Sequence, residues 1–390
     1  MNKQNQHWDI FCEVIDNYGD IGVTWRLAKQ LAKEYQLHIK LWVDDLSSFG
    51  CILPELNPEL TSQHHSDVEI LLWSDENIKD WSAGKVIIEA FACELPTKIA
   101  DEICTLAMSA PFWINLEYLS AEKWVDDLHG LPSFQLNGAK KYFYFPGFTD
   151  KTGGLIYEND LIDLQTHWID KQSKQAFFDK FNINIKTKST IILSIFSYET
   201  PALEALSNEW INGDIEIHAL VPTGRALNSI LPSMQLSADE ITLGRTYSKG
   251  NLQLHVLPMT DQQGYDELLW SCDINIVRGE DSFLRAQWAK KPFIWHIYPQ
   301  DEQAHIEKLN VFLDRYCETL PNDLSKIQRK INLSFNSNYL HSKDQASIIQ
   351  QWMDFVSQYQ KLKTHAENWP NRALSGSDLA TRLVDFVKNR

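Results

Sequence analysis

Residues 272–289, CDINIVRGEDSFLRAQWA, combine the pattern of a buried strand with that of a helix that follows it directly. The β-branched residues of segment 272–277 are typical of a strand covered on both faces. From Phe283 onward the apolar residues recur near the helical period of 3.6. This order predicts an α/β fold, with the turn Arg278-Gly279-Glu280-Asp281-Ser282 at the carboxyl end of its strand.

The turn at 278–282 has two interpretations. A guanidinium beside the free N–H groups of a helix N-terminus suits a phosphate, and Gly279 lets a ligand approach the backbone closely. Alternatively, Arg278 and Asp281 form an ion pair and Ser282 caps the helix. Gly279 favours the phosphate site, but the turn by itself leaves both interpretations open.

A second acidic turn, DNYGDIG at residues 16–22, follows the apolar run 8–15. Apolar residues then recur at helical spacing, and another apolar run spans 38–43, which together predict a βαβ unit. The turn lacks the Gly-x-Gly-x-x-Gly pattern, so a dinucleotide cofactor is not expected. Asp20 either caps the helix or forms with Asp16 a carboxylate pair that acts as a base or binds a cationic substrate.

Strand and helix patterns alternate along most of the chain and predict two α/β domains. We expect an N-terminal domain at 1–155, a C-terminal domain at 175–360, and a helical segment at 361–390 that can pack back on the first domain. Thr200 and Pro201 are typical of an N-cap and a first helical position. Because ligands of such sheets bind at the carboxyl ends of strands, the two acidic turns are expected to face one another across a cleft.

Composition excludes several classes of protein. A formal net charge of −16 argues against a binder of nucleic-acid backbones. The six cysteines include no Cys-x-x-Cys pair, which is typical of a reduced, cytoplasmic protein. The polar start of the sequence and the lack of a long apolar run predict neither a signal peptide nor a membrane span.

Other candidate sites are weaker. The pairs Asp44-Asp45 and Asp126-Asp127 are typical of solvated loops, and no histidine or cysteine array has the spacing of a zinc site, so no metal is expected. Phe196 and Tyr198 end a predicted strand on the cleft side, where they either pack as ordinary aromatic residues or stack on a base.

Longer motifs around both turns resemble those of the EarP family of protein-arginine rhamnosyltransferases, which modify elongation factor P. The resemblance rests on VIDNYGDIGVTWRLA at 14–28 and RGEDSFLRAQWA at 278–289, and on the shorter motifs WINLEYLS at 113–120, PGFT at 146–149 and GGL at 153–155. It spans almost the whole chain.

The resemblance implies a GT-B glycosyltransferase with two Rossmann-like domains, the nucleotide sugar bound by the C-terminal one and the acceptor protein by the N-terminal one. It implies transfer of rhamnose from TDP-β-L-rhamnose to an arginine of elongation factor P, with inversion at the anomeric carbon. The implied reaction uses no metal and no cofactor besides the donor substrate, and involves no nucleic acid or membrane.

Roles carry over to positions that match the family motifs. The implied catalytic residues are Asp20, Glu280 and Asp16. The implied donor-binding residues are Asn17, Tyr18, Gly19, Phe196, Tyr198, Gln262, Tyr265, Arg278, Gly279, Asp281 and Ser282. Met259 departs from the family, which often has an aromatic residue there, so the group that stacks on the thymine is not identified.

Two rival functions remain at this stage. The cleft could serve a GT-B transferase with another nucleotide sugar or acceptor, because Arg278 and a helix N-terminus suit any nucleoside diphosphate. The chain could also be a non-catalytic partner of a translation factor, although both turns keep their acidic residues.

Overall fold

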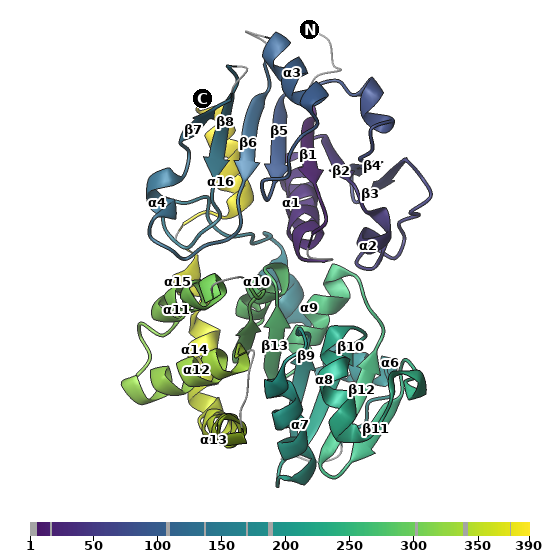
Figure 1. Ribbon diagram of the computed structural model, residues 1–390, viewed down its shortest axis with the longest axis vertical. Helices are drawn as coiled ribbons and strands as arrows, with labels where there is room; N and C mark the ends of the chain where they lie inside the picture. The colour runs from purple at the N-terminus through teal and green to yellow at the C-terminus, as the bar shows by residue number, and fades with distance from the viewer. Residues whose placement is uncertain are drawn as a thin grey trace. The chain divides into compact units, whose positions relative to one another are not determined.

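The computed structural model describes residues 6–15, 18–106, 110–135, 138–168, 171–185, 190–300, 303–337, 342–374 and 376–390. The chain divides into two compact units. One comprises Met1–Asn159 with Ala373–Arg390, and the other comprises Asp160–Arg372. Each unit contains a sheet flanked by helices, which is an α/β arrangement (Figure 1).

The sheet of the first unit has the strand order β3-β4-β2-β1-β5-β6-β8-β7. Its inner strands run parallel, whereas β3 and β7 pair antiparallel at the two edges. The strands are β1 (Trp8–Cys12), β2 (Ile39–Val43), β3 (Ser62–His65), β4 (Val68–Leu72), β5 (Val86–Ala90), β6 (Phe112–Leu116), β7 (Pro132–Phe134) and β8 (Lys140–Tyr144).

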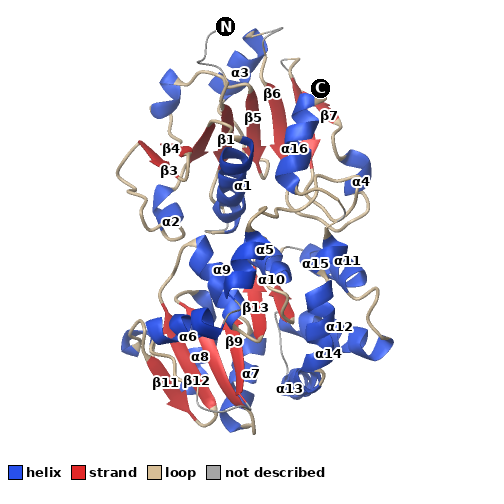
Figure 2. Ribbon diagram, turned by 180° about the vertical axis from the view of Figure 1, so that it is seen from behind, coloured by secondary structure: helices blue, strands red, loops and turns tan. Residues whose placement is uncertain are grey.

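The helices of this unit follow the strands, and one comes from the end of the chain. They are α1 (Gly19–Tyr35), α2 (Leu46–Gly50), η2 (Asn77–Asp80), α3 (Thr97–Thr105), α4 (Val125–Leu128) and α16 (Leu379–Lys388). Figure 2 shows α1 and α16 on the same face of the sheet. The Gln30 amide donates to Asp378 at 3.0 Å, and the Tyr35 and Thr381 hydroxyls are 2.5 Å apart. Residues 373–390 thus complete the first unit.

The sheet of the second unit has the order β11-β12-β10-β9-β13-β14, and β11 alone pairs antiparallel among these strands. The strands are β9 (Thr190–Ile195), β10 (Glu216–Pro222), β11 (Thr246–Lys249), β12 (Leu252–Leu257), β13 (Ile274–Arg278) and β14 (Phe293–His296). The helices are α5 (Leu161–Trp168), α6 (Lys171–Lys180), α7 (Pro201–Asn212), α8 (Arg225–Met234), η4 (Ala238–Glu240), α9 (Gln262–Ser271), α10 (Asp281–Trp288), α11 (Ala304–Tyr316), α12 (Asn322–Phe335), α13 (Ser342–Ser357), α14 (Tyr359–Asn368) and α15 (Pro370–Ala373).

Apolar side chains fill the layer between this sheet and its helices. Ile195, Ile276 and Leu254 on the strands are fully buried, as are Leu203 and Leu206 on α7. The local signal for α7 is confirmed, because Thr200 is the N-cap, its hydroxyl accepts the N–H of Ala202, and Pro201 is the first helical residue. None of the described helices is long and apolar enough to cross a membrane.

Two adjacent central strands, β9 and β13, bring side chains together at the carboxyl ends of the strands, which form one edge of the second sheet. In the parallel pair of β9 and β13, Ile195 lies opposite Ile276. The N–H of Phe196 donates to the Ile276 carbonyl at 2.9 Å. The residues that leave the carboxyl ends of the two strands, Phe196 and Arg278, therefore emerge side by side.

Two buried histidines link the neighbouring strands β10 and β12 of the same sheet. Nδ1 of His218 on β10 lies 2.9 Å from Nε2 of His255 on β12, and Nδ1 of His255 lies 2.8 Å from the Thr246 hydroxyl. Burial and, to a lesser extent, the neighbouring His218 lower the pKa of His255 to about 3. Burial also lowers the pKa of His218, which Glu216 opposes. Both rings are therefore neutral in the folded chain at pH 7.

These histidines should make stability depend on acid. Below pH 6.5 the unfolded chain binds a proton at His255, whereas the folded chain does so only near pH 3. The free energy of unfolding is therefore highest above pH 6.5 and decreases as the pH falls toward 3. Between pH 7 and pH 5 we expect His255 to contribute a loss of about 2 kcal/mol in the free energy of unfolding. Urea unfolding of His255→Asn should show a correspondingly shallower pH dependence. The exposed His64→Asn should match the parent chain, and an unchanged slope in His255→Asn would contradict the assignment.

Candidate active site

The Arg278 guanidinium lies at the carboxyl end of β13, among the predicted donor-binding residues of the second unit. Arg278 is the last residue of β13 and is buried. Its guanidinium carbon lies 4.5 Å from the centroid of the Phe196 ring and 4.8 Å from that of Tyr198. Contact with two aromatic faces orients the cation and replaces part of its hydration. The structure therefore brings three of the predicted donor-binding residues together.

The turn after Arg278 has a conformation that favours glycine. Gly279 has φ of 61°, in the left-handed region, and its carbonyl accepts the indole N–H of Trp295 at 2.9 Å. The Trp295 ring stacks on Phe283, with centroids 3.7 Å apart. Trp295 therefore holds both the strand-to-helix turn, at Gly279, and the start of α10, at Phe283.

The expected start of the following helix is wrong by two residues. Helix α10 begins at Asp281, with Glu280 as the N-cap, so Ser282 lies inside the first turn and is not the cap. Glu280 caps without a side-chain hydrogen bond to the helix. The misplacement has a physical reason, because a serine before an apolar run is a typical cap, whereas here the left-handed glycine sets the start of the helix.

Helix α9 supplies the next group of predicted residues. Gln262 is its first residue and is buried, while Tyr265 lies about one turn later. The Tyr265 ring meets Phe196 edge to face at 5.6 Å. Burial raises the pKa of the Tyr265 phenol, and the neighbouring Ser282 hydroxyl opposes the rise. Phe196, Tyr265, Ser282 and Arg278 thus belong to one contact network.

Sequence reasoning missed Arg225, His296 and Tyr298, which surround Tyr198. The Arg225 guanidinium lies 5.2 Å from the Tyr198 centroid and also pairs with Glu199. His296 and Tyr298 each meet the Tyr198 ring edge to face. The available signal was position, since each of the three residues ends or follows a parallel strand as Arg278 does.

Charges of both signs lie at this edge, because Glu280 and Asp281 follow Arg278 in the turn and Glu199 pairs with Arg225. Burial first, and then the charges of Arg278 and Arg225, lower the pKa of His296 to about 3. His296 is consequently neutral at pH 7, while the two arginines keep their charge. Together with the N–H groups at the start of α10, which have no partner within their own helix, they provide a site for an anion such as a diphosphate.

The acidic turn of the first unit leads into α1. Asp20 is buried in the first turn of this helix, whose N-cap is Tyr18, so the interpretation of Asp20 as the helix cap is wrong. Its Oδ2 accepts the N–H of Ile15 at 3.0 Å, and its Oδ1 accepts the Tyr118 hydroxyl at 3.1 Å. Two donors from outside the helix therefore orient the carboxylate.

Tyr118 is another residue that local pattern did not single out. It follows β6 by two residues, and its ring stacks on Phe91, which follows β5, with centroids 4.6 Å apart. Strands β5 and β6 are parallel neighbours, so their carboxyl ends bring this aromatic pair to the edge beside α1. No pattern local to Asp20 predicts a partner 98 residues away.

The remaining predicted residues divide between the units. Tyr18 and Gly19 stand with Asp20 at the start of α1, while Asp16 and Asn17 lie outside the described residues. The donor residues from Phe196 to Ser282 belong to the second unit. Within the described ranges, no three histidine, cysteine or carboxylate side chains gather as a metal site would require.

Comparisons with known proteins agree on one family. Residues 8–388 match the model of the Elongation-Factor P (EF-P) rhamnosyltransferase family, EarP. A protein-arginine rhamnosyltransferase of Shewanella oneidensis is 51% identical over 390 residues, covering 98% of each chain. One of Pseudomonas aeruginosa is 39% identical over 386 residues, covering 97% of this chain and 98% of its own.

Solved structures show the same fold. One, which describes the structural basis for EarP-mediated arginine glycosylation of translation elongation factor EF-P, matches with a TM-score of 0.67 and 29% identity, covering 98% of this chain and 99% of that chain. A glycosyltransferase of Rickettsia africae matches with a TM-score of 0.55 at 12% identity, covering 99% and 98%. The expectation of a GT-B glycosyltransferase fold is confirmed.

Gly279→Ala tests whether the turn belongs to an anion site. A left-handed alanine costs roughly 1–2 kcal/mol of stability, so we expect thermal unfolding at a lower temperature. The altered turn should also weaken binding of thymidine diphosphate, measured by calorimetry. Gly244, with φ of 73° and open space around it, gives a matched control. Gly244→Ala should cost similar stability with unchanged binding, and unaltered binding by Gly279→Ala would exclude this turn from the site.

Proposed function

This chain belongs to the EarP family of EF-P rhamnosyltransferases, and we propose that it transfers rhamnose from TDP-β-L-rhamnose to an arginine side chain of elongation factor P. The observation that carries the donor assignment is the Arg278 guanidinium held against Phe196 and Tyr198 beside the N-terminus of α10. This arrangement suits a diphosphate that leaves with negative charge.

Donor binding then divides among neighbouring elements. Arg278 and the N–H groups at the start of α10 would hold the diphosphate and stabilise the charge that develops as the sugar–oxygen bond breaks. Gln262 and Tyr265, on α9, would contact the nucleoside, and Asp281 the ribose. In this proposal the donor is the only small molecule required, with no metal and no further cofactor.

The acceptor presents a chemical difficulty that explains an acidic site. An arginine guanidinium is protonated at pH 7, and removing its proton beforehand would cost roughly 7 kcal/mol, about five pKa units at 1.36 kcal/mol each. A fixed carboxylate instead binds the cation and accepts the proton while the nitrogen attacks. Asp20 suits this role, because Ile15 and Tyr118 orient its two oxygens.

The proposed step is a single displacement with inversion. An acceptor nitrogen forms a bond to the anomeric carbon on the face opposite the diphosphate, the bond from that carbon to the phosphate oxygen breaks, and the acceptor proton passes to Asp20. Glu280 would orient the guanidinium or stabilise positive charge on the sugar, and Asp16 would assist in binding the cation. That the two acidic turns meet on one donor stays a prediction.

The setting follows from the acceptor. Elongation factor P is a translation factor, so we propose that the reaction takes place in the cytoplasm, without a nucleic acid or membrane partner. The direct test is intact-mass analysis of elongation factor P after incubation with this chain and TDP-β-L-rhamnose. We expect the mass of one rhamnosyl unit to be added. No change in mass would contradict the proposal, and transfer from a different nucleotide sugar alone would correct the donor.

Removing either carboxylate should separate chemistry from donor binding. We expect Asp20→Asn and Glu280→Gln each to abolish rhamnosyl transfer in the intact-mass assay, because an amide neither accepts the proton nor offsets the positive charge. Calorimetry should show thymidine diphosphate binding within about threefold of the parent chain, a difference below 1 kcal/mol.

An exposed aspartate on a helix of the first unit provides the control. Asp101→Asn makes the same chemical change on α3 and should transfer rhamnose at the parent rate. Near-normal turnover by Asp20→Asn would show that Asp20 is not the base.

A further inference from the structure

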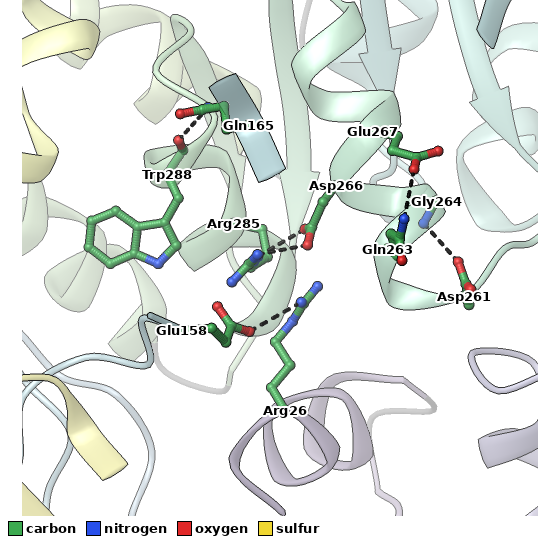
Figure 3. Close-up of polar contacts among 10 residues, drawn as sticks. All are labelled: Arg26, Glu158, Gln165, Asp261, Gln263, Gly264, Asp266, Glu267, Arg285 and Trp288. Carbon is green, nitrogen blue, oxygen red and sulfur yellow. Dashed lines mark hydrogen bonds and ion pairs between the residues drawn. The ribbon is translucent and has the colours of Figure 1, made fainter. Parts of the chain in front are cut away.

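A buried ion pair lies directly behind the residues proposed to bind the donor. Nε of Arg285 donates to Oδ1 of Asp266 at 2.8 Å, and Nη2 donates to Oδ2 at 2.7 Å (Figure 3). Both side chains are buried, with 2% and 7% of their surface exposed. Two parallel hydrogen bonds between a guanidinium and a carboxylate fix their orientation as well as their distance.

The position of this pair links the two helix starts of the donor site. Asp266 lies four residues after Gln262 on α9, and Arg285 lies four residues after Asp281 on α10. Residues four apart lie on the same side of a helix, about one turn from each other. The ion pair therefore joins α9 and α10 about one turn after their first residues, Gln262 and Asp281.

Further contacts fix each helix at other points. The Gln165 amide donates to the carbonyl of Trp288 at the end of α10 at 2.9 Å (Figure 3). The Asp261 carboxylate accepts the N–H of Gly264 at the start of α9 at 2.7 Å. The indole N–H of Trp168 also donates to the Ser271 hydroxyl at the end of α9 at 3.1 Å, and that of Trp369 donates to Gln287 on α10 at 2.8 Å, whereas the Asp266–Arg285 pair joins the two helices directly.

Stability alone does not account for a buried pair of this kind. The desolvation of two charges is commonly as large as their attraction, and apolar pairs of similar volume are often as stable or more stable. What the charged pair supplies in addition is geometry. Displacement of a binding group by about 1 Å can cost on the order of 100-fold in rate.

We propose that Asp266 and Arg285 are positioning residues, which set the spacing between the nucleoside-binding face of α9 and the diphosphate-binding start of α10. The inference rests on the proposed function, because it assigns the two helices to the two halves of a nucleoside diphosphate. Neither residue is proposed to touch the donor.

Single neutral variants are poor tests, because they leave a buried charge without this partner and destabilise the fold. The informative variant is the double substitution Asp266→Leu with Arg285→Met, which replaces the pair by apolar side chains. We expect it to melt within a few degrees of the parent chain. We expect its dissociation constant for thymidine diphosphate to rise about tenfold or more, because two linked halves bind well only when their spacing fits.

The two halves of the ligand give a measurement that a purely structural role would not predict. Thymidine and inorganic pyrophosphate each occupy one half-site, so their dissociation constants, measured by competition, should change less than about threefold. Arg285→Lys, which keeps the buried charge but loses the two-pronged geometry, should show the same selective loss for thymidine diphosphate. This variant keeps the comparison possible if the double variant does not fold.

A matched control exists on the surface of the same unit. Nη1 of Arg329 pairs with Asp314 at 2.8 Å, and the Asp314 side chain is 70% exposed. The double variant Asp314→Leu with Arg329→Met should leave the binding of all three ligands unchanged.

Two outcomes would overturn the inference. One is thymidine diphosphate binding at the parent affinity by the folded double variant or by Arg285→Lys. The other is a parallel loss for thymidine, pyrophosphate and thymidine diphosphate, which would assign the pair a structural role. Absence of thymidine diphosphate binding by the parent chain is a separate result that overturns the proposed function itself.

Discussion

The second unit depends on one constraint, the parallel register of β9 and β13. Because Ile195 lies opposite Ile276, the chain leaves both strands at the same level of the sheet, and Arg278 emerges against Phe196 and Tyr198. A buried guanidinium is costly unless its environment offsets the lost hydration, and two aromatic faces provide part of that offset. The same register places Gly279 where a left-handed turn can start α10 immediately.

The acidic group of the first unit, Asp20, follows the same rule with opposite charge. Parallel strands β5 and β6 bring Phe91 and Tyr118 to the start of α1, where Tyr118 donates to Asp20. In both units an aromatic residue after one strand orients an ionised group after another. The sheet supplies the position, and the aromatic residue restricts the rotation of the charged side chain.

Sequence alone predicted what depends on local pattern. The alternation of strands and helices predicted the α/β class, and the Thr200-Pro201 pair predicted the start of α7, because capping involves neighbours in the chain. Local chemistry misled where a more distant constraint was stronger, as with Ser282 and Asp20, which are not the helix caps. Arg225, Tyr118 and the Asp266–Arg285 pair could not be found, since their partners are brought close only by the fold. The longer family motifs identified the candidate residues but not these contacts.

The local field, and not the net charge, decides what each edge attracts. The chain carries −16 overall, yet charges beyond about 8 Å are largely screened at physiological ionic strength. Within that range of Tyr198 stand Arg278 and Arg225, the latter paired with Glu199. Since burial keeps His296 neutral, the positive charges here are those of the two arginines, which do not depend on protonation near pH 7. An acidic chain thus places two guanidinium groups around Tyr198 in one unit, and in the other a carboxylate, that of Asp20, held by two donors.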